Sequence, residues 1–172
     1  MAKLTDIPAG SAVYVDANIF IYHFTGVSHE ATAFLERCEV GDLAGYTGSL
    51  VLLEVMHRLM IIEARMKGLS LGSSPARQLA DHPDVVKSLH EYNYHATRIP
   101  EMGVTILDLP PQFASRSFEF RHRYGLLTND SIIALEMADA GLSWLASSDR
   151  AFDRVPQISR AAPSDLPSDF RS

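Results

Sequence analysis

The stretch Val13-Tyr14-Val15-Asp16-Ala17-Asn18-Ile19-Phe20 lies near the start of the chain and decides how the rest is interpreted. Its first three residues form a short β-branched and aromatic run, which is typical of a buried strand. The strand ends at Asp16, and the residues from Asn18 to Phe24 look like the first turns of a helix. A buried strand that passes directly into a helix is a building unit of α/β proteins.

The remainder of the chain continues this alternation of short strands and helices. We expect further strands at 43–47, 105–109 and 142–147, and a last edge strand at 157–160. We expect helices at 31–38, 50–66, 84–96, 111–124 and 129–140, with Ser49 as the N-cap of the longest, and one helical turn at 151–155. This pattern predicts an α/β fold with a mainly parallel sheet and helices on both faces.

Length and composition favour one globular domain over residues 1–172. The chain is 47% hydrophobic and 21% charged, which argues against disorder. We expect its core at about residues 12–160. Residues 67–100 begin with a Gly, Ser and Pro cluster and are predicted to form a helical insertion. The polar end, 163–172, is rich in Pro and Ser and is predicted to be a loose tail.

Cysteine usage and hydropathy indicate the compartment. Cys38 is the one cysteine of the sequence, so a disulfide framework and a Cys-rich zinc site are excluded. The N-terminus lacks the features of a signal peptide, and no apolar stretch reaches 18 residues. We therefore expect a cytoplasmic protein without a membrane partner.

The net charge of −6 is not that of a tight, non-specific nucleic-acid binder. An acidic centre with a local basic rim is nevertheless compatible with a nuclease. Arg116, Arg121, His122 and Arg123 form the one basic cluster, which could bind an RNA backbone. The alternative is that this cluster is simply a solvated helix face.

Acidic residues occur where the predicted strands end. Asp16 and Asp149 follow strands, and Asp130 opens a helix after a short loop, so all three can point to one edge of the sheet. Glu54 is a lone carboxylate within the apolar run 50–56. Burying an unpaired charge is costly, so Glu54 needs a partner or a function.

Each acid also has a purely structural interpretation. Asp16 and Asp149 could be helix or turn caps, and Asp130 could favour the positive end of its helix dipole. Glu54 has Arg58 four residues later, which is the spacing of a helical ion pair.

Together, however, these carboxylates would repel one another strongly. Two unit charges about 4 Å apart at an effective dielectric near 20 cost on the order of 4 kcal/mol. Raised pKa values or a bound divalent cation must offset that cost. An all-oxygen site suits Mg²⁺ or Mn²⁺ rather than zinc, and such an ion supplies what phosphodiester cleavage needs.

Four blocks of the sequence, in this order and context, resemble the PIN domain family and in particular its VapC-like ribonucleases. The blocks are Val13 to Phe20, Gly48 to Val55, Leu127 to Leu135 and Trp144 to Val155. The resemblance covers about residues 12–160. It implies a three-layer α/β/α sandwich and a metal-dependent ribonuclease site.

The resemblance also implies roles for individual residues. Asp16, Glu54, Asp130 and Asp149 would be the acidic quartet, with Asp16 and Asp130, and next Asp149, as the direct ligands of Mg²⁺ or Mn²⁺. Glu54 would hold a metal-bound water or a second ion. Asn18 and Ser147 would support the ligands, Ser147 standing where the family often has Thr. Asp153 is a peripheral candidate that could merely pair with Arg150 or Arg154.

The function that follows is cleavage of RNA by the toxin of a toxin–antitoxin pair. Its partner would be a small antitoxin that blocks the groove, for example by placing an arginine against the carboxylates. Two alternatives remain: a non-catalytic RNA-binding or assembly protein with the same fold, and another Mg²⁺-dependent phosphoryl-transfer enzyme. The insertion at 67–100 is longer than in the smallest family members.

A homodimer is a further expectation. The helix predicted at 50–66 has more apolar residues than one core face needs. They are Met56, Leu59, Met60, Ile61 and Ile62.

Overall fold

A single parallel sheet organises the protein, whose computed structural model describes residues 2–168. Within these residues the six strands have the order β1-β6-β5-β2-β3-β4, and every neighbouring pair is parallel. The strands are β1 (Ala2–Lys3), β2 (Ala12–Val15), β3 (Ala44–Gly48), β4 (Val104–Leu107), β5 (Trp144–Ala146) and β6 (Ser159–Ala162). Strand β2 lies in the middle, and its residues 13–15 are fully buried. The expected parallel α/β sheet is confirmed.

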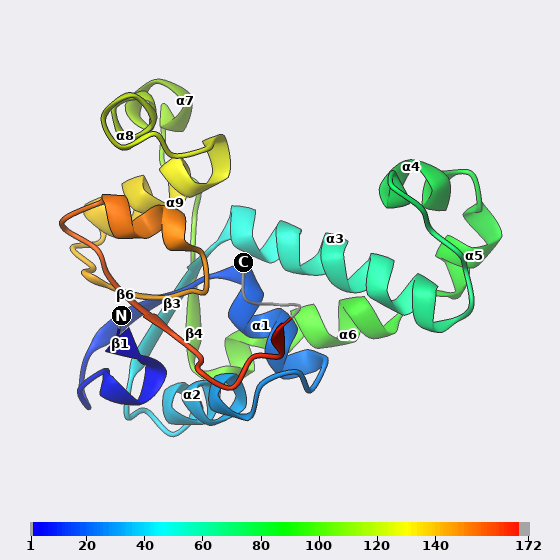
Figure 1. The fold of residues 1–172 in the computed structure, drawn as a ribbon, viewed down its shortest axis with the longest axis horizontal. Helices are drawn as coiled ribbons and strands as arrows, with labels where there is room; N and C mark the ends of the chain where they lie inside the picture. The colour runs from blue at the N-terminus through cyan, green and yellow to red at the C-terminus, as the bar shows by residue number, and fades with distance from the viewer. Residues whose placement is uncertain (1, 169–172) are drawn as a thin grey trace.

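Helices cover both faces of this sheet. The α-helices are α1 (Ala17–Phe24), α2 (His29–Glu39), α3 (Ser49–Met66), α4 (Pro75–Ala80), α5 (Pro83–Ser88), α6 (Glu91–Thr97), α7 (Phe113–Arg116), α8 (Phe118–Tyr124) and α9 (Thr128–Asp139). Short 3₁₀ turns form η1 (Leu4–Asp6), η2 (Ile99–Met102) and η3 (Arg150–Arg154). Figure 1 shows α7, α8 and α9 on one side of the sheet and α1, α2 and α6 on the other, so the α/β/α sandwich is confirmed.

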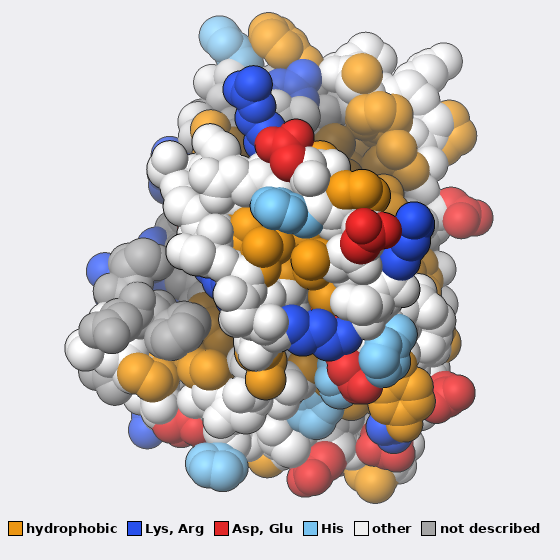
Figure 2. All heavy atoms as spheres, turned by 90° about the vertical axis from the view of Figure 1, so that its right-hand side faces the viewer, with side chains coloured by type: hydrophobic (Ala, Val, Ile, Leu, Met, Phe, Trp, Pro, Cys, Tyr) orange, Lys and Arg blue, Asp and Glu red, His pale blue; other side chains and the backbone are white. Residues whose placement is uncertain are grey.

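Helix α3 is long and extends away from the sheet (Figure 1). Helices α4 and α5 pack near its far end around a small second core of Ala64, Leu79 and Leu89, with Met60 partly buried against it. The segment 67–100 thus supplies its own apolar contacts to α3. Viewed from the side on which α3 projects, the surface has hydrophobic side chains with charged and histidine side chains among them (Figure 2).

This insertion accounts for part of the apolar excess on α3. Leu59 is buried, Ile62 packs against the main core and Met60 packs against the second core. Leu53 and Met66 remain exposed, at 62% and 83%. The homodimer stays a prediction.

The predicted helix over 84–96 is wrong in one respect, because it is two helices. Helix α5 ends at Ser88, and α6 begins at Glu91. The carboxylate of Glu63 on α3 accepts hydrogen bonds from the backbone N–H groups of His90 and Tyr92, at 3.0 and 3.1 Å. A side chain distant in sequence thus caps α6 and fixes the break.

Two other helix starts differ from the prediction. The N-cap of α3 is Gly48 rather than Ser49, whose hydroxyl instead donates to the carbonyl of Leu107 at 3.0 Å. The helix predicted over 111–124 begins only at Phe113, because Gln112 has a left-handed backbone with φ of 57°. It is also divided at Ser117 into α7 and α8.

The C-terminal region is more ordered than expected. Strand β6 is not an edge strand, because it pairs with both β5 and β1. The predicted loose tail is wrong over 163–168: Ser164 donates to Glu30, the carboxylate of Asp165 caps the start of α2, and Leu166 is buried. These contacts tie the segment to α2, while residues 169–172 lie outside the described part of the chain.

A buried tyrosine–glutamate pair connects β2 and α9. The hydroxyl of Tyr14 donates a hydrogen bond to the carboxyl of Glu136, and both side chains are almost fully buried. Burial raises the pKa of Glu136. The second carboxyl oxygen, Oε1, has no hydrogen-bond partner among the described residues. A Cβ at position 48 would collide with this carboxyl group and with the Tyr14 hydroxyl, so the pair requires glycine there.

None of the helices in residues 2–168 has the length and hydrophobicity required to span a bilayer.

We predict that Gly48→Ala lowers the free energy of unfolding by about 1–3 kcal/mol, because the added methyl group overpacks the Tyr14–Glu136 pair. Urea denaturation measures this change. Gly72→Ala is the matched control, since a Cβ there approaches only the flexible end of Gln78, at 3.3 Å. Equal stability of the Gly48 and Gly72 variants would contradict the prediction.

Candidate active site

The carboxylate of Asp16 is the centre of the candidate site. Asp16 directly follows β2 and is the N-cap of α1, where its Oδ1 accepts a hydrogen bond of 2.7 Å from the N–H of Ala17. Its Oδ2 accepts hydrogen bonds from the hydroxyl of Ser147, at 2.6 Å, and from the side-chain amide of Asn18. The cap interpretation is therefore correct, but it leaves the second carboxylate oxygen to other contacts.

Ser147 connects Asp16 to the segment that carries Asp149. The Ser147 hydroxyl accepts hydrogen bonds from the backbone N–H of Asp149, at 3.0 Å, and from the side-chain amide of Asn18, at 3.2 Å. The carbonyl oxygen of Asn18 in turn accepts from the N–H of Ser148 at 3.2 Å. These bonds hold the ends of β2 and β5 together.

Asp149 and Asp130 also occupy helix starts. Asp149 is the N-cap of η3 and accepts a hydrogen bond of 2.7 Å from the N–H of Ala151. Asp130 lies in the first turn of α9, which favours a negative charge. Both structural interpretations of these residues are compatible with a second role at the same sheet edge.

The charges of the four acids act on one another. Burial raises the pKa of Asp16 to about 6, and the carboxylates of Glu54 and Asp149 add to this effect against the opposing hydrogen bonds. Burial also raises the pKa of Asp130, and again Asp149 and Glu54 contribute. The structure thus brings the four predicted acids close enough to interact. We call Asp16, Glu54, Asp130 and Asp149 the acidic site.

Glu54 differs from the buried Asp16 because it is half-buried and has a basic neighbour. Arg58, one turn later on α3, approaches its carboxylate to 3.4 Å. A surface ion pair of this kind contributes little to stability. Glu54 is therefore not held in place as Asp16 is.

Comparison with known families agrees with this geometry. The PIN domain family matches residues 13–158, which include all four acids. The chain belongs to the PIN domain family. A search of curated proteins finds no match.

Solved structures show the same fold. A toxin–antitoxin complex from Klebsiella pneumoniae aligns with a TM-score of 0.56 and 22% identity, over 87% of this chain and 96% of that one. VapBC2 from Rickettsia felis, bound to a promoter DNA fragment, aligns at 0.55 and 14%, over 89% and 99%. PAE2754 from Pyrobaculum aerophilum aligns at 0.53 and 16%, over 87% and 89%. At these identities the likeness concerns the fold alone.

The acidic site of this PIN domain has the ligand chemistry of a hard cation. Its donors are carboxylate oxygens, with no thiolate and no imidazole, which suits Mg²⁺ or Mn²⁺. Among residues 2–168, no three His, Cys, Asp or Glu side chains are gathered tightly enough to hold a metal ion as they stand. The donor types nevertheless fit, since Mg²⁺ is commonly held by one or two carboxylates with water at its other positions.

The expected pairing of Asp153 with Arg150 or Arg154 is wrong. Asp153 instead forms two hydrogen bonds, of 2.7 and 2.9 Å, with Arg160 on β6. These bonds lower the pKa of Asp153. Sequence reasoning missed Arg160, although an arginine within the last strand expected at 157–160 was a signal that could have been followed.

The predicted RNA-binding arginines are engaged within the protein. Arg116 forms two hydrogen bonds with Asp139, of 2.8 and 2.6 Å. Arg121 donates to the hydroxyl groups of Ser117 and Ser131. Arg123 lies over the ring of Tyr124, with its Cζ 5.4 Å from the ring centre. Their binding of RNA stays a prediction.

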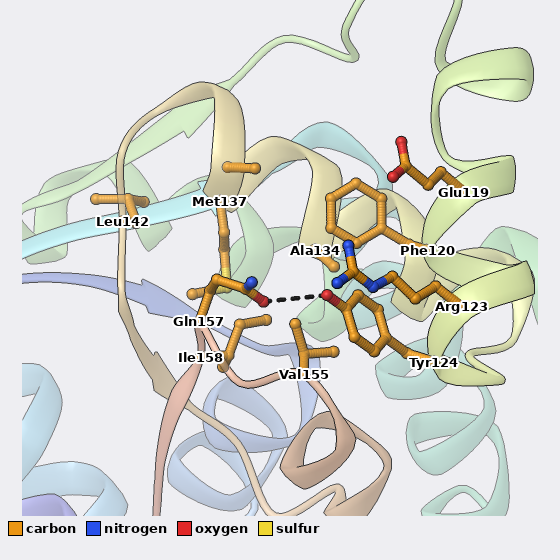
Figure 3. A pocket seen from close by; sticks show the side chains of 11 residues that line it. Glu119, Phe120, Arg123, Tyr124, Ala134, Met137, Leu142, Val155, Gln157 and Ile158 are labelled. Carbon is orange, nitrogen blue, oxygen red and sulfur yellow. Dashed lines mark hydrogen bonds between the residues drawn. The ribbon is translucent and has the colours of Figure 1, made fainter.

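A separate pocket of about 260 Å³ lies between α8, α9 and the segment after η3. Figure 3 shows Phe120 and Tyr124 on one side and Val155 and Ile158 on the other, with the Tyr124 hydroxyl bonded to Gln157. None of the four acids lines this pocket. It is therefore distinct from the acidic site.

The raised pKa of Asp16 predicts a pH-dependent loss of stability in the absence of divalent cations. Because the folded-state pKa, about 6, exceeds the ordinary value of 3.8, the favourable contribution of protonated Asp16 is present below about pH 4. It is lost as the pH rises toward 6, at a cost of about 3 kcal/mol. In EDTA, we expect the unfolding free energy of the wild type to fall relative to that of Asp16→Asn over this interval. Parallel pH profiles for the two proteins would contradict this.

Proposed function

We propose that this PIN domain is an endoribonuclease that depends on Mg²⁺ or Mn²⁺. Nuclease activity is general in the family. The observation that carries the proposal is the environment of Asp16: a nearly buried carboxylate, fixed by Ser147 and Asn18 and facing the charges of Glu54 and Asp149. A non-catalytic RNA-binding module would have no need of this crowding, which disfavours the ionised forms.

The residues present suggest a division of roles. Asp16, Asp130 and Asp149 would hold the cation, since a carboxylate accepts at about four sites and these are not filled by the hydrogen bonds described. When bound, a divalent cation lowers the pKa of a water molecule and neutralises charge on the phosphate oxygens. Glu54, which is partly exposed, is the carboxylate that we assign to orienting the attacking water. Ser147 and Asn18 hold the Asp16 carboxylate in one orientation.

The negative charge of the acidic site also predicts cation dependence. Without a cation, the carboxylates repel an RNA phosphate group, as like charges do at short range. RNA cleavage should therefore require added metal and stop in EDTA.

We predict that the purified protein cleaves single-stranded RNA with Mg²⁺ or Mn²⁺ and that Asp16→Asn or Asp130→Asn lowers the rate by about 100-fold or more. The reason is that metal-assisted catalysis supplies several kcal/mol of transition-state stabilisation, and each 1.36 kcal/mol is a factor of ten. Cleavage of a fluorescent oligonucleotide measures the rate.

Asp84→Asn is the matched control, because the Asp84 side chain on α5 is 95% exposed and belongs to the insertion. Cleavage that is equal in the wild type and both site variants would identify a contaminating nuclease and overturn the proposal. The melting temperature with and without Mn²⁺ is a second measurement, which a trace of contaminating nuclease does not affect. A cation that binds the folded state raises this temperature.

We also propose a small antitoxin protein as a partner. The Klebsiella pneumoniae and Rickettsia felis structures are toxin–antitoxin complexes. In this chain, Leu53 precedes Glu54 and Leu127 lies three residues before Asp130, and these leucines are 62% and 76% exposed. Apolar side chains beside a carboxylate cluster are complementary to a peptide that offers an arginine and apolar anchors.

We predict that a protein encoded by a neighbouring small reading frame co-purifies with this chain and blocks RNA cleavage. Leu127→Asp should weaken the complex at least about 10-fold, because it removes an apolar contact and adds charge. Val40→Asp is the control, since Val40 is 78% exposed but is the C-cap of α2, shortly before β3 begins, whereas the acidic site lies beyond the ends of β2 and β5. Binding is measured by titration calorimetry, and a complex that neither substitution weakens would refute the placement.

A further inference from the structure

Arg160 is a buried cation that is hydrogen-bonded to the segment carrying Asp149 of the acidic site. It is part of β6, and its side chain is only 2% exposed. Its guanidinium binds the Asp153 carboxylate through two hydrogen bonds and donates a third, of 3.1 Å, to the backbone carbonyl of Ser147. Burying a guanidinium is costly unless its donors are matched, and here three of them are.

These three bonds hold the two ends of one short segment. Ser147 begins the segment directly after β5, and Asp153 lies in η3 near its end. Asp149 lies between them, with its N–H bonded to the Ser147 hydroxyl and its Oδ1 bonded to the N–H of Ala151. Arg160 therefore acts on the backbone that carries Asp149 without contacting Asp149.

The same arginine acts indirectly on Asp16. The carbonyl of Ser147 is held by Arg160, the N–H of Ser147 donates to the carbonyl of Ala161 at 2.9 Å, and the hydroxyl of Ser147 donates to Asp16. Because both backbone groups of Ser147 are hydrogen-bonded, its side chain leaves the backbone at a defined position. The orientation of the Asp16 carboxylate thus depends on β6.

We propose that Arg160, fixed by Asp153, is a positioning residue that sets the separation of Asp16 and Asp149. This inference rests on the proposed nuclease function and adds a residue whose hydrogen bonds go to Asp153 and Ser147 rather than to the four acids of the site. A planar guanidinium can satisfy a carboxylate and a carbonyl together, whereas a lysine ammonium is a point charge without this fork geometry. Lysine at position 160 should keep the positive charge but lose the simultaneous hydrogen bonds to the Asp153 carboxylate and the Ser147 carbonyl.

The experiment compares Arg160→Lys with Arg37→Lys. Arg37 is a matched control because it also pairs with an aspartate, Asp42, and donates to two backbone carbonyls, of Leu4 and Ile7, away from the acidic site. Supporting residues of metal ligands typically change affinity or activity 10–100-fold. We expect Arg160→Lys to lower kcat about 10-fold or more and to raise the Mn²⁺ concentration for half-maximal rate, with the KM for RNA at saturating Mn²⁺ unchanged. Arg37→Lys should retain the wild-type values.

Asp153→Asn provides a second variant should Arg160→Lys fail to fold, because the Asp153 side chain is 53% exposed. The substitution retains the arginine but removes the carboxylate charge that fixes its guanidinium. We expect it to lower kcat about threefold or more at an unchanged KM. A kcat within twofold of the wild type in both folded variants, Arg160→Lys and Asp153→Asn, would overturn the inference.

A reading independent of activity separates this inference from the proposed function. Hydrogen exchange at the amides of Asp149 and Ala151 reports the bonds that Arg160 is argued to hold in place. Faster exchange at these amides in Arg160→Lys, but not in Arg37→Lys, supports the positioning role even if the wild type cleaves no RNA. Unchanged exchange overturns the positioning role even if the wild type is an active nuclease.

Discussion

The hydrogen bond from the Ser147 hydroxyl to the Asp16 carboxylate is the contact on which the candidate site depends. It exists because β2 and β5 are parallel neighbours whose register pairs Val15 with Ala146. The next residue of each strand, Asp16 and Ser147, then leaves the sheet at the same level, and the N–H of Asp16 donates to the carbonyl of Ala146 at 3.0 Å. An antiparallel pairing would place these two residues at opposite ends.

Two other acids of this chain, Asp153 and Glu63, have hydrogen-bond and ionic partners that stabilise their charged forms, which sets the acidic site apart. Arg160 lowers the pKa of Asp153, and the amides of His90 and Tyr92, together with Lys67, lower that of Glu63 against its burial. In contrast, the pKa values of Asp16 and Asp130 are raised by burial and by neighbouring carboxylates. The chain therefore has cations and amides available for acids, yet it leaves these two short of compensation. Such unrelieved charge is typical of a functional site.

Sequence reasoning succeeded where local pattern determines structure. The run Val13 to Val15 predicts a buried strand, and Asp16 follows from its end. It failed where the decisive partner is distant in sequence: the break between α5 and α6 is set by Glu63, and Asp153 pairs with Arg160 rather than with its neighbours. Strand β1 was missed because it has two residues and is defined only by its pairing with β6.

Glu136 shows that a raised carboxyl pKa alone does not identify the site. Like Asp16, it is buried and has a raised pKa, but its partner is the hydroxyl of Tyr14, and no neighbouring carboxylate contributes to the shift. It is compatible with a neutral acid packed against Gly48, which needs no cation. What distinguishes Asp16 is the combination of burial with the charges of Glu54 and Asp149. A divalent cation bound among these carboxylates would offset their mutual repulsion.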